Sequence, residues 1–135
     1  MIIDTSALLA FFDLDEPRHD DVGAIIEGSA EPLVVPPYVV AELDYVLATR
    51  RGVDAELAAM RELAGGAWDL PAMDAQDLTT SAGVISKYAD QQIGIADASL
   101  VVLAERYSTR TVVTLDRRHF SVIRPLSGGR FAIRP

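Results

Sequence analysis

Residues 1–12, MIIDTSALLAFF, decide the fold class of this chain. The apolar run of residues 1–3 ends in Asp4, and two hydroxyl residues and helically spaced apolar residues follow it. A continuously apolar, β-branched strand is typical of a parallel sheet that is covered on both faces. The stretch therefore predicts a strand, a carboxylate at its carboxyl end, and a helix over residues 5–12.

The remainder of the chain repeats this alternation of short apolar runs and helical patterns, which is typical of βαβ units. A second continuously apolar run, TVVTLD, occupies residues 111–116. Further strands are expected at 32–36 (PLVVP), at 67–71 (AWDLP) and at 121–125 (SVIRP) or 130–135 (RFAIRP), and helices at 5–12, 18–27, 37–50, 54–64, 75–88 and 96–107. The predicted class is α/β, a single-domain α/β/α sandwich over residues 1–135 with a central, mostly parallel sheet.

Composition limits the kind of protein that this chain forms. Its 135 residues, half of them hydrophobic, suffice to bury one core. The absence of cysteine excludes disulfide bonds and thiolate metal sites. No apolar stretch approaches the ~18 residues of a membrane span, and the start lacks the basic region of a signal peptide. We expect a cytoplasmic protein that does not associate with membranes.

Charge is distributed unevenly along the chain. The net charge of −8 weighs against a nucleic-acid partner, because phosphate binding depends on lysine and arginine. Residues 1–105 hold 19 acids and 5 bases, whereas residues 106–135 hold 7 arginines and one acid, Asp116. The asymmetry either keeps a small protein soluble or provides a local basic segment for a polyanion. Charge alone leaves both interpretations open.

Four acids are candidate functional residues. Asp4 and Asp116 directly follow the two apolar runs, where open parallel sheets place their ligands. Either acid also suits a helix cap or a turn. Glu42 lies within the helical segment YVVAELDYVLATR and is predicted to point inward, whereas Asp44 is expected to be solvated. Asp97 begins an almost wholly apolar helix, where the helix dipole also favours a carboxylate.

Four neighbouring buried carboxylates need a compensating cation, because each loses hydration and repels the others. No lysine or arginine accompanies these acids except beside Asp116. Mg²⁺, or Mn²⁺ in its place, accepts carboxylate ligands and needs neither histidine nor cysteine. Ser6, Ser99 and Thr114 are candidates to orient the carboxylates or bound waters.

Four segments resemble the PIN domains, and in particular the VapC-type ribonuclease toxins of bacterial toxin–antitoxin pairs. They are MIIDTSALLAFF, VVAELDYVL, IGIADASLVVLAER and VVTLDRRHF, and they span nearly the whole chain. The resemblance implies a PIN-like fold and a metal-dependent endoribonuclease in which Asp4, Glu42, Asp97 and Asp116 hold Mg²⁺ or Mn²⁺. It places Thr5 and Ser6 in the same motif as Asp4. It also implies an inhibitory antitoxin partner and a homodimer.

The C-terminal arginines gain a function if the substrate is RNA. Arg117 and Arg118 follow Asp116 and are expected at the rim of the site, where they and His119 would contact phosphates. Arg50 and Arg51, at the far end of the third helix, are expected to matter less. The alternatives are a non-catalytic PIN-like module that binds RNA or protein, and a housekeeping RNA-processing nuclease. A phosphoaspartate receiver fits poorly, because the chain lacks a lysine on a late strand.

Overall fold

The computed structural model describes residues 1–135 and contains a short parallel sheet. Strand β1 (Ile2–Ile3) pairs with β2 (Thr111–Val113), and β2 pairs with β3 (Ala132–Arg134), all in parallel. Single parallel bridges extend the sheet beyond β1, from Ile2 to Val34 and from Val34 to Asp69. The predicted α/β class with a central parallel sheet is confirmed.

Two of the expected strands are reduced to these single bridges. The segments at 32–36 and 67–71 make only a few sheet hydrogen bonds, such as Ile3 N–H to the Val34 carbonyl at 2.9 Å. Prolines at both ends of the first segment lack the N–H groups that a longer ladder needs. Of the two alternatives for the last strand, 130–135 is right and 121–125 is wrong. Ser121 and Val122 continue a helix that begins after Asp116.

All six expected helices are present, and their ends differ from the expected ones by at most one residue. The helices are α1 (Thr5–Phe12), α2 (His19–Glu27), α3 (Pro37–Arg51), α4 (Val53–Leu63), α5 (Ala75–Lys87) and α6 (Ile95–Arg106), with an unpredicted short helix α7 (Arg117–Val122) and a 3₁₀ turn η1 (Ala89–Gln91). Pro37 supplies the fixed φ that suits a first helical residue. Gly52, at a φ of +84°, separates α3 from α4 in a conformation that favours glycine.

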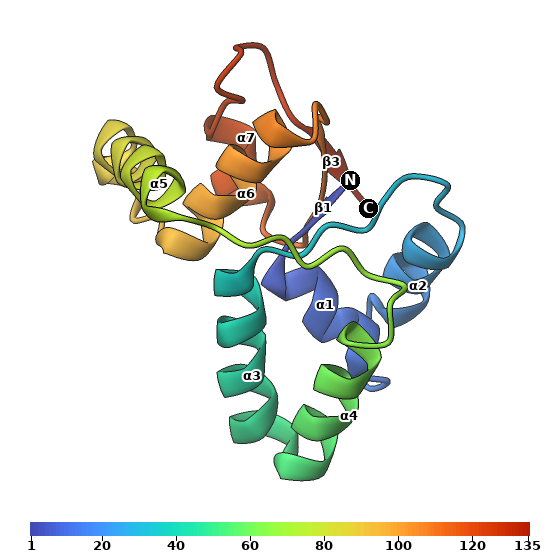
Figure 1. The fold of residues 1–135 in the computed structure, drawn as a ribbon. Coiled ribbons are helices and arrows are strands. Elements are labelled where there is room, and N and C mark those ends of the chain that lie inside the picture. Colours follow the sequence, from blue (N-terminus) through green and yellow to red (C-terminus); the bar gives the residue numbers. More distant parts are fainter.

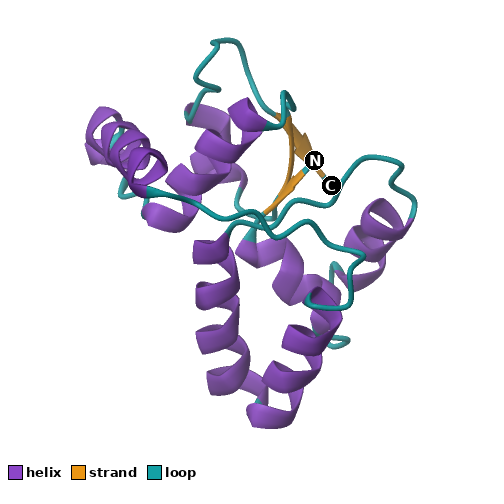
Figure 2. Ribbon diagram, in the orientation of Figure 1, coloured by secondary structure: helices purple, strands orange, loops and turns teal.

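The helices are arranged around the sheet so that its carboxyl edge stays accessible. Helices α5, α6 and α7 lie on one side of the strands, and α6 contacts β1 while α7 contacts β3 (Figure 1). Helices α3 and α4 pack against each other and extend away from the strands (Figure 2). None of the helices combines the length and apolar character needed to span a membrane.

One continuous hydrophobic core joins the sheet to both groups of helices. Residues 98–104 of α6 are all buried, as the apolar sequence of this helix predicts. Trp68 and Phe120 are 7% and 1% exposed and belong to this core. The rings of Phe11 and Phe12 pack against Trp68 with centroids 5.5 and 6.3 Å away.

An ion pair between the buried Asp13 and the exposed Arg51 ties the end of α1 to the end of α3. Arg51 Nε donates to Asp13 Oδ2 at 2.7 Å, and another guanidinium nitrogen lies 2.7 Å from Asp13 Oδ1. The hydrogen bond from Arg51 lowers the pKa of Asp13, although burial of the carboxyl opposes this change. Two nitrogens of the Arg51 guanidinium thus contact the two carboxylate oxygens of Asp13, which gives Arg51 a structural role.

Asp13→Asn is expected to lower the urea midpoint by about 0.5–1 M at pH 7. Because folding lowers the pKa of Asp13, the ion pair stabilises the fold fully above the ordinary aspartate pKa of about 4, and that stability is lost as the pH falls through the lower folded value. Urea titrations at pH 7, 5 and 3 should show the difference between variant and wild type shrinking below pH 4. Asp20→Asn, at an exposed position of α2, is the control, and a pH-independent difference would contradict the prediction.

Candidate functional site

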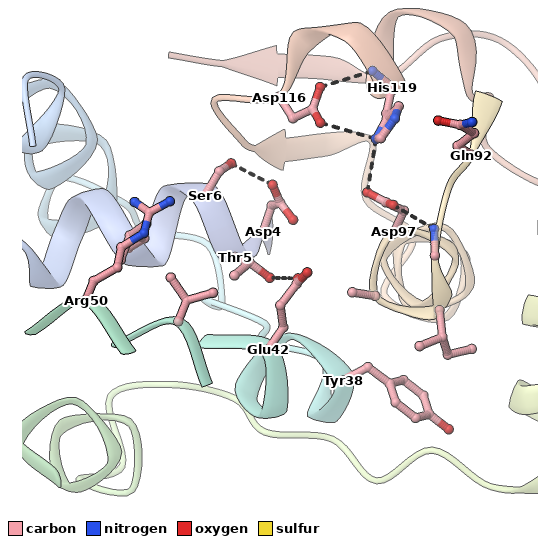
Figure 3. A pocket seen from close by; sticks show the side chains of 15 residues that line it. Asp4, Thr5, Ser6, Tyr38, Glu42, Arg50, Gln92, Asp97, Asp116 and His119 are labelled. Carbon is pink, nitrogen blue, oxygen red and sulfur yellow. Dashed lines mark hydrogen bonds and ion pairs between the residues drawn. The ribbon is translucent and has the colours of Figure 1, made fainter. Parts of the chain in front are cut away.

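A pocket of about 620 Å³ opens at the carboxyl ends of β1 and β2. All four predicted acids line it: Asp4, Glu42, Asp97 and Asp116. They come from four different parts of the chain, and their side chains surround one cavity (Figure 3). The structure therefore brings the quartet to a common site.

Asp4 is the buried centre of this site, with 6% of its surface exposed. It occupies the N-cap position of α1, but its side chain makes no capping hydrogen bond. Instead, its Oδ2 accepts hydrogen bonds from Ser6 Oγ and Thr114 Oγ1, both at 2.7 Å. The helix-cap alternative is therefore wrong for Asp4, whose carboxylate is held in place by two hydroxyl groups.

The same hydroxyls join the loop after β2 to the start of α1. Ser6 Oγ accepts from the Leu115 N–H at 2.9 Å, and Thr114 Oγ1 accepts from the Asp116 N–H at 2.9 Å. Thr114 is fully buried. The expectation that Ser6 and Thr114 contact a carboxylate is met by this geometry.

The two carboxylate oxygens of Asp97 have different partners: one caps the start of α6, and the other faces His119. Its Oδ2 accepts from the Gly94 N–H at 3.0 Å, and its Oδ1 lies 3.7 Å from His119 Nδ1. Burial raises the pKa of Asp97, and the negative charges of Asp4 and Asp116 raise it further, whereas the Gly94 hydrogen bond and His119 oppose the rise. Negative charge therefore accumulates on this side of the pocket.

Asp116 also combines a cap with a place in the cluster. Its Oδ1 accepts from the backbone N–H groups of Arg118 and His119 at 3.1 and 3.3 Å, so the cap alternative is right for this oxygen. Its Oδ2 lies 3.2 Å from His119 Nδ1, at ion-pair distance but without hydrogen-bond alignment. The imidazole of His119 thus lies between the carboxylates of Asp97 and Asp116 (Figure 3).

Glu42 lines the pocket but is exposed, so the expectation that it points into the core is wrong. The core-facing residues of α3 are Val39, Leu43 and Leu47, which form a different stripe of the helix. Thr5 Oγ1 donates to Glu42 Oε2 at 2.5 Å, which joins α1 to α3 at the pocket wall. Asp44 lies close enough to Glu56 to share a hydrogen bond that raises the pKa of Glu56.

Other predicted residues lie elsewhere. Ser99 is fully buried and donates to the Ala96 carbonyl of its own helix at 2.6 Å, so it orients no carboxylate. Arg117 and Arg118 are exposed and do not line the pocket, and the Arg117 guanidinium donates to the Pro135 carbonyl. Their role as RNA contacts stays a prediction.

Three polar side chains that line the pocket are not predicted by the sequence: Tyr38, Arg50 and Gln92. Arg50 was expected to lie away from the site, and that expectation is wrong. The spacing of Glu42, Val46 and Arg50, four residues apart on α3, is the signal that could have found it. No comparable sequence signal points to Gln92, whose φ of +55° is a local feature of the turn after η1.

The donor set suits a hard divalent cation in its chemistry, since carboxylate oxygens surround the pocket. The pKa of Asp97 is raised first by burial and then by the charges of Asp4 and Asp116. Asp4 Oδ1 and Glu42 Oε1 make no hydrogen bond within the chain. In this structure, however, no three of the Asp, Glu and His side chains are placed to hold one ion together. Asp4, Glu42, Asp97 and Asp116 are thus assembled around a shared cavity without forming a closed coordination sphere.

Solved structures with the same fold cover nearly the whole chain. The crystal structure of Mycobacterium tuberculosis VapC20, described as a sarcin-ricin loop cleaving toxin, aligns with a TM-score of 0.85 over 99% of this chain and 98% of that chain, at 16% identity. The structure of VapBC2 from Rickettsia felis, bound to a DNA fragment from their promoter, aligns with a TM-score of 0.71 over 99% of this chain and 98% of that chain, at 12% identity. The structure of FitAcB from Neisseria gonorrhoeae aligns with a TM-score of 0.66 over 99% of this chain and 96% of that chain, at 19% identity. At these identities the likeness shows the fold.

Sequence comparison is more specific. The PIN domain family model matches residues 1–124. Ribonuclease VapC26 from Mycobacterium tuberculosis is 64% identical over 135 residues, which are all of this chain and all of that protein. The chain belongs to the PIN-domain family and, within it, to the VapC-type proteins.

Proposed function

We propose that this protein is a metal-dependent endoribonuclease that acts as the toxin of a toxin–antitoxin pair. The observation that carries the proposal is the convergence of four carboxylates on one pocket, with the central one, Asp4, held by two hydroxyl donors. Full-length identity of 64% to a ribonuclease supports the reaction class.

Each acid has a proposed role. Asp4 and Asp97 would be the principal ligands of Mg²⁺ or Mn²⁺, and Glu42 and Asp116 would complete the ligand set or accept a proton. The bound cation would neutralise a phosphate oxygen and lower the pKa of a water molecule. Glu42 is exposed and keeps one oxygen free, which suits a group that accepts a proton from water. Hydrolysis by water leaves a 5′-phosphate and a 3′-hydroxyl.

The proposed partners are RNA, an inhibitory antitoxin and a second copy of the chain. Similarity to VapBC2 and FitAcB supports an antitoxin partner. An amphipathic segment that carries arginine would complement the acidic pocket. His119 and the exposed Arg117 and Arg118 remain proposed RNA contacts.

The decisive experiment is incubation of the purified protein with total cellular RNA and Mg²⁺. We expect discrete fragments whose new ends carry 5′-phosphates, detected by direct adapter ligation and sequencing. RNA binding without fragments would instead indicate a non-catalytic module. Cleavage without growth arrest on expression would contradict the toxin role and favour a housekeeping nuclease.

Thr114→Val is expected to lower cleavage by about 10–100-fold, because it removes one of the two hydroxyls that orient Asp4 while keeping the shape of the side chain. It also leaves the Asp116 N–H without its acceptor. The rate should be measured on a defined RNA under single-turnover conditions. Thr49→Val, which removes an exposed hydroxyl bonded within α3, is the control. Equal rates for both variants would show that Asp4 does not need this support.

A further inference from the structure

We propose that Arg50 binds a backbone phosphate of the RNA strand and so positions the strand across the four carboxylates. This inference rests on the proposed ribonuclease function. Arg50 is the only lysine or arginine among the residues that line the pocket. A polyanion that enters a cavity lined by four carboxylates needs a fixed cation at the wall, because metal ligation alone does not hold the neighbouring nucleotides.

The position of Arg50 on α3 directs it into the site. Glu42, Val46 and Arg50 follow one another at four-residue intervals and line one wall of the pocket. The Arg50 guanidinium lies 3.6 Å from Glu16 Oε1, in the segment that follows α1, while Arg50 itself lines the pocket. Figure 3 shows it on the Ser6 and Glu42 side of the cavity, opposite Asp97 and Gln92. An RNA strand whose phosphate is bound by Arg50 would run across the pocket, past all four carboxylates.

Arg50 is available for a ligand, in contrast to its neighbour. Its one ionic partner is Glu16, at 3.6 Å, which is beyond hydrogen-bond distance, and 57% of the Arg50 side chain is exposed. Arg51 instead pairs with Asp13 at 2.7 Å and with Asp15 at 2.9 Å. Arg51 is thus committed to the fold, whereas the Arg50 guanidinium makes no hydrogen bond and has only the long ionic contact with Glu16.

The free guanidinium has the geometry that a phosphate requires. Its planar donors match two phosphate oxygens at once, and a phosphate contact is independent of base identity. Of the arginines that directly follow Asp116, Arg117 is bonded to the Pro135 carbonyl and neither lines the pocket. Arg50 is therefore the one arginine that lines the pocket of the four carboxylates.

The test measures binding of a labelled single-stranded RNA oligonucleotide of mixed sequence by proteins that carry Asp4→Asn, so that the RNA survives. Adding Arg50→Gln should weaken binding about tenfold and reduce the slope of log affinity against log salt by about 0.7. Arg50→Lys should keep the slope and lose part of the affinity. Arg61→Gln, an equal charge loss at an exposed position of α4, is the matched control. Equal effects of Arg50→Gln and Arg61→Gln would overturn the inference.

A second arm locates the phosphate. RNA oligonucleotides with one neutral methylphosphonate linkage at a time should reveal a linkage whose neutralisation weakens binding to the protein that retains Arg50 but not to the Arg50→Gln protein. Identical profiles for both proteins would overturn the inference. Wild-type cleavage, assayed separately, distinguishes the two failures. Cleavage together with identical profiles defeats only the role of Arg50, whereas the absence of cleavage defeats the proposed function.

Discussion

Asp4→Asn is expected to lower RNA cleavage by at least about 1,000-fold while the protein remains folded. The substitution removes the negative charge at the centre of the pocket but retains a carbonyl oxygen that accepts from Ser6 and Thr114. Because these hydrogen bonds are kept, the loss should arise from the chemistry and not from a displaced α1. The measurement is single-turnover cleavage of one defined RNA.

The stability of the Asp4→Asn protein separates these two causes. Asp4 raises the pKa of Asp97 through its charge, so its neutralisation relieves repulsion in the metal-free protein. We expect an unchanged or higher melting temperature. For the cleavage rate, Asp44→Asn is the control, because Asp44 lies on α3 near Glu42 but does not line the pocket. Cleavage by Asp4→Asn at the wild-type rate would refute the site assignment.

Excess EDTA is expected to abolish cleavage, and Mg²⁺ or Mn²⁺ to restore it. The acidic pocket contains four carboxylates and one imidazole, and its unpaired oxygens suit hard cations. A cation that binds only the folded state stabilises it by mass action. At 10 to 100 times the dissociation constant, Mg²⁺ should raise Tm by about 3–8 °C.

The double variant Asp4→Asn, Asp97→Asn should show neither the activity nor the cation-dependent increase in Tm. Ca²⁺ should raise Tm without supporting turnover, since its looser coordination activates water less well. Calorimetric melts with each cation, measured beside the cleavage assay, provide both readouts. Full activity in excess chelator would remove the metal from the mechanism and leave the carboxylates without their proposed role.

Features that depend on neighbouring residues could be predicted from the sequence. The apolar run before Asp4 predicts β1, because a strand buried on both faces needs continuous hydrophobicity. The same argument predicts β2 before Asp116. Helical periodicity predicts the ends of α1 to α6 to within one residue, and Pro37 and Gly52 mark the start and end of α3 through local backbone preferences. Placement of two acids at strand ends then predicts a site at the carboxyl edge of the sheet.

Features that depend on distant contacts were decided by the tertiary structure. Helix α3 packs its apolar residues Val39, Leu43 and Leu47 into the core. The neighbouring face of the same helix, which carries Glu42 and Arg50, therefore lines the pocket and stays exposed. Thr114 reaches Asp4 across 110 residues of sequence, a contact that exists only once β2 pairs with β1. The charge state and partners of a side chain depend on what the fold brings beside it, so sequence alone identified the acids and only the folded chain showed which oxygens remain free.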